Sequence, residues 1–360
     1  MTVTKYPSIQ VDGFGFMPGD YRQVVRRYTI TNRNNATVRL ISLGAGIQSV
    51  KVPNNNNDLA DVVLGFDDLS GYLQNRYIGR IINRSYDPFA RSSPATNCSV
   101  NIDDSSNTDI VNWDSYVSDD RVVMTRVSSI ENGYLMVQVS YGPWSNENRL
   151  HVEIRATSTR PVAVDIVSYC LFNLAGHGMG PRELKSHVVT INANKRLELE
   201  GDVAGKVDAV NELRSPTRLC SRLLFQVPGG GYNHNFCVVD YSSAWSYRFH
   251  ARILHPASGR FLEVYSNHPS VRLYTGNHLP DPEKINVTEL DKVRCKKNTI
   301  SKHTRGLMGK DGALYTRHGC FALVPQGYPE SFSCQNCPSN ILYPGKIYVH
   351  DLSYDFGVAI

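Results

Sequence analysis

Tyr134-Leu-Met-Val-Gln-Val-Ser-Tyr141 and Leu150-His-Val-Glu-Ile-Arg-Ala156 are two runs in which bulky apolar side chains recur at every second position. Successive side chains of a β-strand point to opposite faces of its sheet, so a period of two indicates strands with one face in a core. The residues that bound these runs are mostly Gly, Pro, Asn and Ser, which are typical of turns. These runs therefore predict β-strands separated by tight turns.

Runs of this kind extend along most of the chain, and many short strands with close turns predict an all-β sandwich. The best helical window is short, residues 67–75, with Asp67 or Asp68 as the candidate N-cap. We find no internal repeat and no linker, because strand patterns resume on both sides of the polar stretch 97–108. We therefore predict one large domain over residues 1–360. Further strands are predicted at residues 39–43, 121–127, 162–167, 187–191, 197–200, 236–240, 252–255 and 261–265.

The composition excludes several classes of protein. Hydrophobic residues make up 41% of the chain and charged residues 20%, a balance that indicates a globular protein and not a disordered one. The net charge of +5 is spread over 360 residues without a Lys/Arg block, so we predict no nucleic-acid partner. No stretch approaches the ~18 apolar residues of a membrane helix, and no apolar secretory signal is visible, so we predict a cytoplasmic protein without a membrane partner.

The eight cysteines are scattered along the chain, which indicates reduced thiols. Cys334 and Cys337 have the spacing of a zinc knuckle, but a single pair supplies only two of the four ligands of a structural zinc site. We therefore predict no metal and no cofactor.

Six segments carry characteristic combinations of Gly, Asn, Pro and aromatic residues: Asp61-Val-Val-Leu-Gly-Phe-Asp-Asp-Leu-Ser-Gly-Tyr72, Ile78-Gly-Arg-Ile-Ile-Asn-Arg84, Phe172-Asn-Leu-Ala-Gly176, His255-Pro-Ala-Ser-Gly-Arg-Phe-Leu-Glu-Val-Tyr265, Tyr274-Thr-Gly-Asn277 and Gln326-Gly-Tyr-Pro-Glu-Ser331. In their order and separations they resemble the aldose 1-epimerase (galactose mutarotase) family. The resemblance covers nearly the whole chain. It implies a large twisted β-sandwich, the galactose mutarotase-like supersandwich, with a sugar site in a cleft on one sheet.

The activity that the resemblance implies is the interconversion of α- and β-sugars through ring opening. A carboxylate base takes the proton of the anomeric hydroxyl, and an imidazole acid protonates the ring oxygen. Alignment with the family's Leu-Glu-Thr-Gln run places Val324 at the base position, where an isopropyl group cannot accept a proton. The acid position is Tyr169, and a phenol with an ordinary pKa of about 10 is a poor acid at neutral pH. We therefore predict no catalytic residue at either position.

The resemblance also implies where a ligand would bind. Asn83 and Arg84 match the family's substrate-contacting pair, Asn233 stands in place of a sugar-holding Asp, and Arg272 stands in place of a Gln. Asn233 keeps an oxygen that accepts hydrogen bonds, but it lacks the negative charge with which Asp strengthens bonds to sugar hydroxyls. Arg272 either fills the cleft or selects an anionic ligand. The family's His-Gly-Gly segment, upstream of a Trp, has no counterpart in residues 101–108.

Two residues are candidates for a displaced acid/base pair. Glu330 lies six residues after Val324, at a position where the family has an Asp, and His177 follows the Phe172-Asn-Leu-Ala-Gly176 segment. We interpret His177 as an ordinary loop histidine. The other histidines near the family segments are interpreted as structural in two cases and as a surface residue in the third: His187, His234 and His318.

Three functions follow from these observations, and the sequence leaves all three open. The preferred hypothesis is a catalytically inactive or strongly impaired mutarotase-like protein that binds a monosaccharide or another small polar ligand. The second is an active aldose 1-epimerase with a displaced acid/base pair. The third is a scaffold with a vestigial cleft that binds a protein partner.

Overall fold

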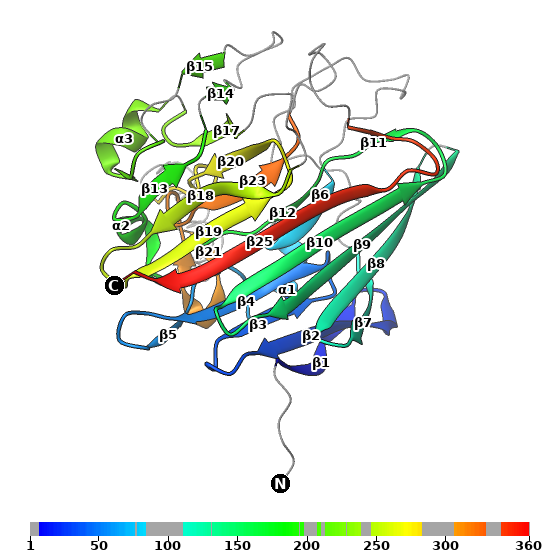
Figure 1. Cartoon of the computed structure of the whole chain (residues 1–360). Coiled ribbons are helices and arrows are strands. Elements are labelled where there is room, and N and C mark those ends of the chain that lie inside the picture. Colours follow the sequence, from blue (N-terminus) through cyan, green and yellow to red (C-terminus); the bar gives the residue numbers. More distant parts are fainter. Residues whose placement is uncertain are drawn as a thin grey trace, which may run out of the picture.

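The structure is a computed structural model, and its strands and helices are shown in Figure 1. It is built almost entirely of β-strands that form stacked sheets, which confirms the predicted all-β sandwich. None of the helices in the described part of the chain is long and apolar enough to cross a membrane. The structure describes residues 7–75, 78–83, 111–130, 132–193, 195–197, 207–209, 213–227, 229–238, 246–282, 306–328 and 340–359.

The larger layer is a nine-stranded sheet. Its strands follow the spatial order β16 (Thr217–Arg218), β13 (Val188–Ile191), β18 (Arg248–Leu254), β19 (Arg260–Ser266), β25 (Tyr348–Val358), β10 (Arg149–Ser158), β9 (Gly133–Trp144), β8 (Arg121–Ile130) and β7 (Asp114–Ser118). Although β25 comes last among these strands in the chain, it lies at the centre of the sheet, where it pairs with both β19 and β10 in antiparallel fashion.

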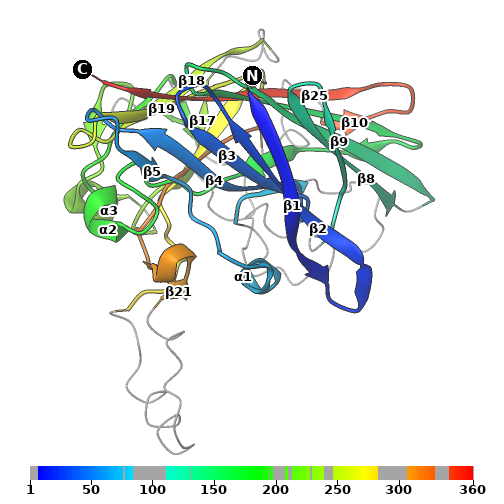
Figure 2. The ribbon, with the colours of Figure 1, turned by 90° about the horizontal axis from the view of Figure 1, so that it is seen from below.

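Smaller sheets form the facing layer, and Figure 2 shows the first of them against the nine-stranded sheet. This sheet contains β1 (Ser8–Met17), β2 (Asp20–Thr31), β3 (Thr37–Ile41), β4 (Gly46–Pro53) and β5 (Leu59–Asp61). The second contains β15 (Val207–Ala209), β14 (Lys195–Leu197), β17 (Asn233–Cys237), β20 (Ser270–Tyr274) and β23 (Ala322–Gln326). Three two-stranded pairs complete the layer: β6 (Arg80–Asn83) with β12 (Ile166–Tyr169), β11 (Val162–Ala163) with β24 (Ile341–Leu342), and β21 (Leu307–Met308) with β22 (Leu314–Tyr315).

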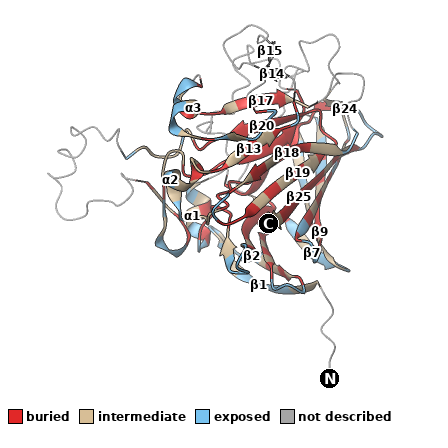
Figure 3. Ribbon diagram, turned by 60° about the vertical axis from the view of Figure 1, so that its left-hand side comes forward, coloured by how far each residue is buried: buried red, intermediate tan, exposed pale blue. Residues whose placement is uncertain are grey.

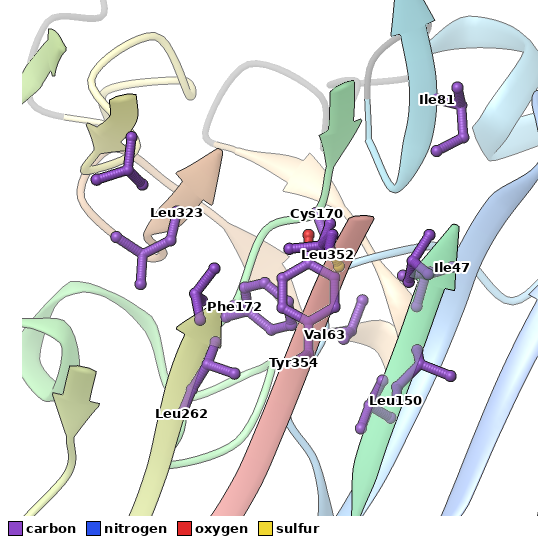
Figure 4. Packing of buried hydrophobic residues seen from close by; sticks show 14 of the residues in the cluster. Ile47, Val63, Ile81, Leu150, Cys170, Phe172, Leu262, Leu323, Leu352 and Tyr354 are labelled. Carbon is purple, nitrogen blue, oxygen red and sulfur yellow. The ribbon is translucent and has the colours of Figure 1, made fainter. Parts of the chain in front are cut away.

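The main core fills the space between the two layers, and the buried residues run through the middle of the molecule in Figure 3. Phe172 joins the layers, because its ring packs 5.8 Å from that of Phe321 in the smaller layer and 5.5 Å from that of Tyr354 on β25. Figure 4 shows Phe172 and Tyr354 among aliphatic side chains from both layers, including Leu262 and Leu323.

A second apolar cluster lies on the other face of β6, β12, β20 and β23. The helix α1 (Leu69–Gln74) packs onto it through Leu69 and Tyr72. Asp68 is the N-cap of α1, because its side chain accepts a hydrogen bond from the Gly71 N–H at 3.1 Å. This confirms the helix predicted at residues 67–75. The remaining helices of the described part are α2 (Gly180–Leu184), α3 (Ser221–Gln226) and the 3₁₀ turn η3 (Lys310–Gly312).

The run 162–167 was predicted as one strand, but the structure divides it between β11 and β12. Asp165 sits at the break. Its backbone N–H donates to Asn83 Oδ1 at 3.2 Å, and its carboxylate accepts from the Gly327 N–H at 3.0 Å. The chain therefore changes its pairing partner at Asp165, from β24 to β6.

Candidate functional site

The predicted site residues meet on one face of the second five-stranded sheet, which we call the site face. On β20, Arg272 lies directly opposite Val324 on β23 and Asn235 on β17. Their neighbours Leu273 and Leu323 point the other way, into the main core. Because side chains alternate along a strand, Asn235, Arg272 and Val324 form one cross-strand row on the site face.

Strand β12 lies next to this sheet. Phe172, just after β12, and Phe321, just before β23, form an isolated antiparallel bridge, with reciprocal N–H···O hydrogen bonds of 2.7 and 2.9 Å. The strands β12 and β23 are in contact, and Tyr169 of β12 pairs with Arg80 of β6. The predicted acid position, Tyr169, and the predicted base position, Val324, both belong to the second apolar cluster.

Both of these positions are buried among apolar side chains. Val324 is 1% exposed and Tyr169 is 6% exposed, and both belong to the second apolar cluster. The ring of Tyr169 packs 6.2 Å from that of Tyr274, which pairs with Ala322 next to Val324 along β23. This part of the site face is an apolar floor.

The polar part of the site face includes Arg272, which is in the row, and Asn233, which contacts it. The Arg272 guanidinium is 3% exposed and donates from Nε and Nη2 to Asn233 Oδ1, at 2.9 and 2.6 Å. Asn233 is half-buried at the start of β17. Their direct contact explains how an arginine is accommodated at this position, because two of its N–H groups share the amide oxygen as acceptor.

Two further polar side chains on the site face were missed at the sequence level. Asn235 and Gln326 are both fully buried, and neither the oxygen nor the nitrogen of either carboxamide has a hydrogen-bond partner among the described residues. The alternation of side chains along a strand could have identified them. Asn235 follows Asn233 by two residues and Gln326 follows Val324 by two, so each lies on the same face as a predicted site residue. Buried carboxamides without partners are rare and call for a ligand, a water or a functional reason.

Asn83 lies apart from the row. It pairs with Ile166, three residues along β6 from the Arg80–Tyr169 pair, and its side chain is exposed. Its Oδ1 accepts the hydrogen bond from Asp165 that marks the strand break. Arg84, Glu330 and the stretch 97–108 lie outside the described residues, as do Cys334 and Cys337.

His177 is half-buried, and its ring faces two side chains from other segments. Its Nδ1 lies 3.1 Å from Tyr315 Oη, and its Nε2 lies 3.2 Å from a carboxylate oxygen of Asp311. Burial lowers the pKa of His177, and the nearby Lys310 charge lowers it further. The partners of His177 belong to β22 and η3 and not to the row, so the ring is held by a local network.

The remaining histidines have structural partners. His187 is fully buried, and its Nε2 accepts from the Leu174 N–H at 3.0 Å, which is the structural role that we predicted for it. Buried His234 accepts from the Asn233 N–H through Nδ1 at 3.1 Å. The surface position predicted for His318 is wrong: the ring is half-buried, and Nδ1 donates to the Thr275 carbonyl at 2.8 Å.

The chemistry of the site face follows from its side chains. Along the described strands β17, β20, β23 and β12, its rows contain amides, a guanidinium, hydroxyls, a thiol and apolar groups, but no carboxylate and no imidazole. The surface can donate and accept hydrogen bonds, but within these rows it has no group that exchanges a proton readily near pH 7. No cluster of three or more potential metal-ligating side chains occurs in the described ranges.

Comparison with known proteins places the chain among sugar-converting relatives. The family model described as Aldose 1-epimerase matches residues 26–355. Galactose mutarotase from Bos taurus is 32% identical over 345 residues, covering 89% of this chain and 91% of the relative. The Homo sapiens galactose mutarotase is 31% identical over the same length and coverage.

Solved structures of similar proteins have the same fold as this chain. The GalM/aldose epimerase homologue from C. elegans superposes with a TM-score of 0.72 at 17% identity, over 93% of this chain and 100% of the other. Galactose 1-epimerase from Lactobacillus acidophilus superposes with a TM-score of 0.66, also at 17% identity, over 98% and 100% of the two chains. At this identity the likeness concerns the fold alone.

Proposed function

Because the chain belongs to the aldose 1-epimerase family, we propose that it is a member with lost or strongly impaired epimerase activity that binds a carbohydrate or another small polar ligand. The observation that carries this proposal is the cross-strand row on the site face. In that row the position assigned to the base holds the isopropyl group of Val324, and the position assigned to the acid holds the phenol of Tyr169, which belongs to the same apolar cluster.

Mutarotation depends on two proton transfers. An isopropyl group accepts no proton, and a buried phenol does not protonate a ring oxygen readily at neutral pH. General acid–base catalysis contributes about 10²–10⁴-fold for each positioned group. Without both groups, we expect the chain to open a sugar ring at least ~10⁴-fold more slowly than an active relative.

The polar side chains of the site face support binding without turnover. Asn235 and Gln326 present four polar atoms without partners, next to Arg272 and Ser270 on the strand between them. A ligand hydroxyl is both a donor and an acceptor, so it can satisfy either end of a carboxamide. A polyhydroxylated ligand, such as a monosaccharide, is the class that we propose, with Asn83, Arg84, Asn233 and Arg272 as further contacts.

A specific observation favours each alternative. The curated relatives at 31–32% identity are named galactose mutarotases, which favours an active enzyme with a displaced acid/base pair. The burial of Val324 and Tyr169 favours a scaffold with a vestigial cleft and a protein partner.

We also propose that the chain is one domain and works in the cytoplasm.

Polarimetry with freshly dissolved α-D-galactose and α-D-glucose tests the loss of activity, with the human galactose mutarotase as the positive control. We expect the wild-type chain to leave the rate of optical relaxation at the buffer value. A rate above buffer that disappears in the Arg84→Ala variant would mean that the family reaction persists with other groups.

Titration calorimetry against monosaccharides and uronic acids tests binding. We expect heat with at least one of them, and a weaker affinity in the Asn233→Ala variant, because Asn233 orients Arg272. The absence of heat with every sugar would favour the scaffold and its protein partner.

A further inference from the structure

A cationic pocket is lined by residues of α2 and α3 and of the segments before β17 and after β22. The two helices are on the left in Figure 1. Its volume is about 300 Å³. Its walls come from separate segments, represented by Lys185, Ser221, Gly230 and Thr316. None of the described residues that line it belongs to the site face, so it is distinct from the proposed sugar site.

The charges around the pocket are not balanced. Arg317 pairs with Asp281, with Nη1 3.1 Å from a carboxylate oxygen. Lys185 also lines the pocket and makes no ion pair within the described part of the chain. The three side chains together carry one positive charge in excess. In addition, Arg317 Nε is buried and donates to no acceptor.

The pocket wall is held in place by backbone that suits only glycine. Gly230 has a φ of +70°, and a Cβ there would lie 2.8 Å from Arg317 Nη2. Gly231 has a φ of +143°, and a Cβ there would lie 2.7 Å from the His318 ring. The chain therefore packs directly against Arg317 and His318, which limits their movement.

We propose that this pocket binds the phosphate group of a small phosphorylated molecule. The residues that line the pocket offer donors from several segments: the Lys185 ammonium and the hydroxyls of Ser221 and Thr316. Donors spread around a cavity suit a tetrahedral oxyanion, whereas a planar carboxylate is matched by a single bidentate arginine. The volume is at the lower end of the range for ligand pockets, which fits a phosphate monoester.

Phe225 indicates that the ligand extends beyond its phosphate. Its side chain is on the rim of the pocket, and the residue is 87% exposed, the highest value among the large hydrophobic residues of the described part. An exposed ring beside a cationic pocket can cover an apolar or ring-shaped part of a ligand. A sugar phosphate has both parts, whereas inorganic phosphate has only the anion.

Calorimetry with three probes tests this proposal: inorganic phosphate, glucose 6-phosphate and glucose, at constant ionic strength. We expect glucose 6-phosphate to bind, and the Lys185→Gln variant to weaken its affinity by about tenfold or more, because one charge-assisted contact is lost. Lys185→Arg retains the charge and should retain the affinity. Lys346→Gln is the matched control, since this exposed lysine precedes β25 and does not line the pocket.

The outcomes separate this pocket from the site face. Equal affinity for inorganic phosphate and its ester would assign the pocket to the free anion. Equal affinity of wild type and Lys185→Gln for both phosphates, or no heat with either, would overturn the proposal. Asn233→Ala should leave phosphate binding unchanged, and glucose binding reports on the site face, so either proposal can fail while the other stands.

Discussion

Asn235 and Gln326 are unusual at the scale of single residues, because a fully buried carboxamide normally has partners for both of its polar atoms. A buried polar atom that no protein group satisfies lowers the stability of the folded chain. A polar ligand would supply the missing bonds. The two residues therefore link the stability of the chain to its proposed binding function.

We predict that Asn235→Leu and Gln326→Met each raise the free energy of unfolding by roughly 1–3 kcal/mol, since each removes an unsatisfied group while keeping similar volume. The same variants should weaken sugar binding in calorimetry. Urea unfolding gives the stability change. Asn32→Leu is the control, because Asn32 is equally buried but bonds to Ser145 and Asn148, so this variant should be destabilised.

If Asn235→Leu loses as much stability as Asn32→Leu, the Asn235 carboxamide has a partner in the folded chain. That result would contradict its proposed role in binding. If both site-face variants gain stability and still bind the sugar as tightly as the wild type, the ligand does not contact them.

The residue types at the site could be predicted from the sequence, but their surroundings could not. Aligning Val324 and Tyr169 with the family positions required only local motifs. Their place in one apolar cluster depends on the contact of β12 with β23, which are far apart in the chain, so no local pattern contained it. The half-buried state of His318 was missed for the same reason, because its partner Thr275 lies on a different segment.

At the scale of elements, strands with strict alternation were the most predictable. β9 and β10 appear where the two opening runs placed them, because one face of each strand packs into the main core. α1 was predictable from its N-cap Asp68. The division of 162–167 was not, because it depends on the contacts of Asp165 with residues on β6 and after β23.

The ion pair of Lys310 and Asp61 connects the short η3 turn to the first five-stranded sheet. Lys310 Nζ donates to an Asp61 carboxylate oxygen at 2.6 Å and to the Gln48 carbonyl at 2.9 Å. The Lys310 side chain is 6% exposed and that of Asp61 is 10% exposed, so water screens the pair only weakly.

We predict that Lys310→Met lowers the free energy of unfolding by about 3–5 kcal/mol, because it leaves the Asp61 carboxylate buried without its counter-charge. The double variant Lys310→Met/Asp61→Asn should recover part of this loss. Asn at position 61 can still accept from the Val50 and Val63 N–H groups that now bond to Oδ1. Urea unfolding of the wild type, Lys310→Met, Asp61→Asn and the double variant measures the coupling. A double variant no more stable than Lys310→Met would show that the charge is not the cause.

At the scale of the whole molecule, buried imidazoles make stability depend on pH. Burial lowers the pKa of His187 to about 3, of His250 to about 4 and of His268 to about 3. In the unfolded chain they would protonate near pH 6.5. Below that pH the unfolded state binds protons that the folded state does not, so the stability present above pH 6.5 is lost as the pH falls toward the folded pKa values.

We predict that the free energy of unfolding is constant between pH 8 and 7 and falls below pH 6.5, by up to about 1.4 kcal/mol per pH unit for each of the three histidines. Urea unfolding at pH 7.5, 6.5 and 5.5 measures this slope. The variant His268→Gln should have a shallower slope than the wild type. Equal stability at pH 7.5 and 5.5 would mean that the three rings are protonated in the folded state.

The central position of β25 also has a consequence for how the protein is made. During translation, β25 leaves the ribosome after every other strand of the nine-stranded sheet, although it is the strand that joins β19 to β10. Until then, the nascent chain holds two half-sheets with open backbone edges, which can pair with other chains. These edges therefore stay open to pairing with other chains until β25 has been made.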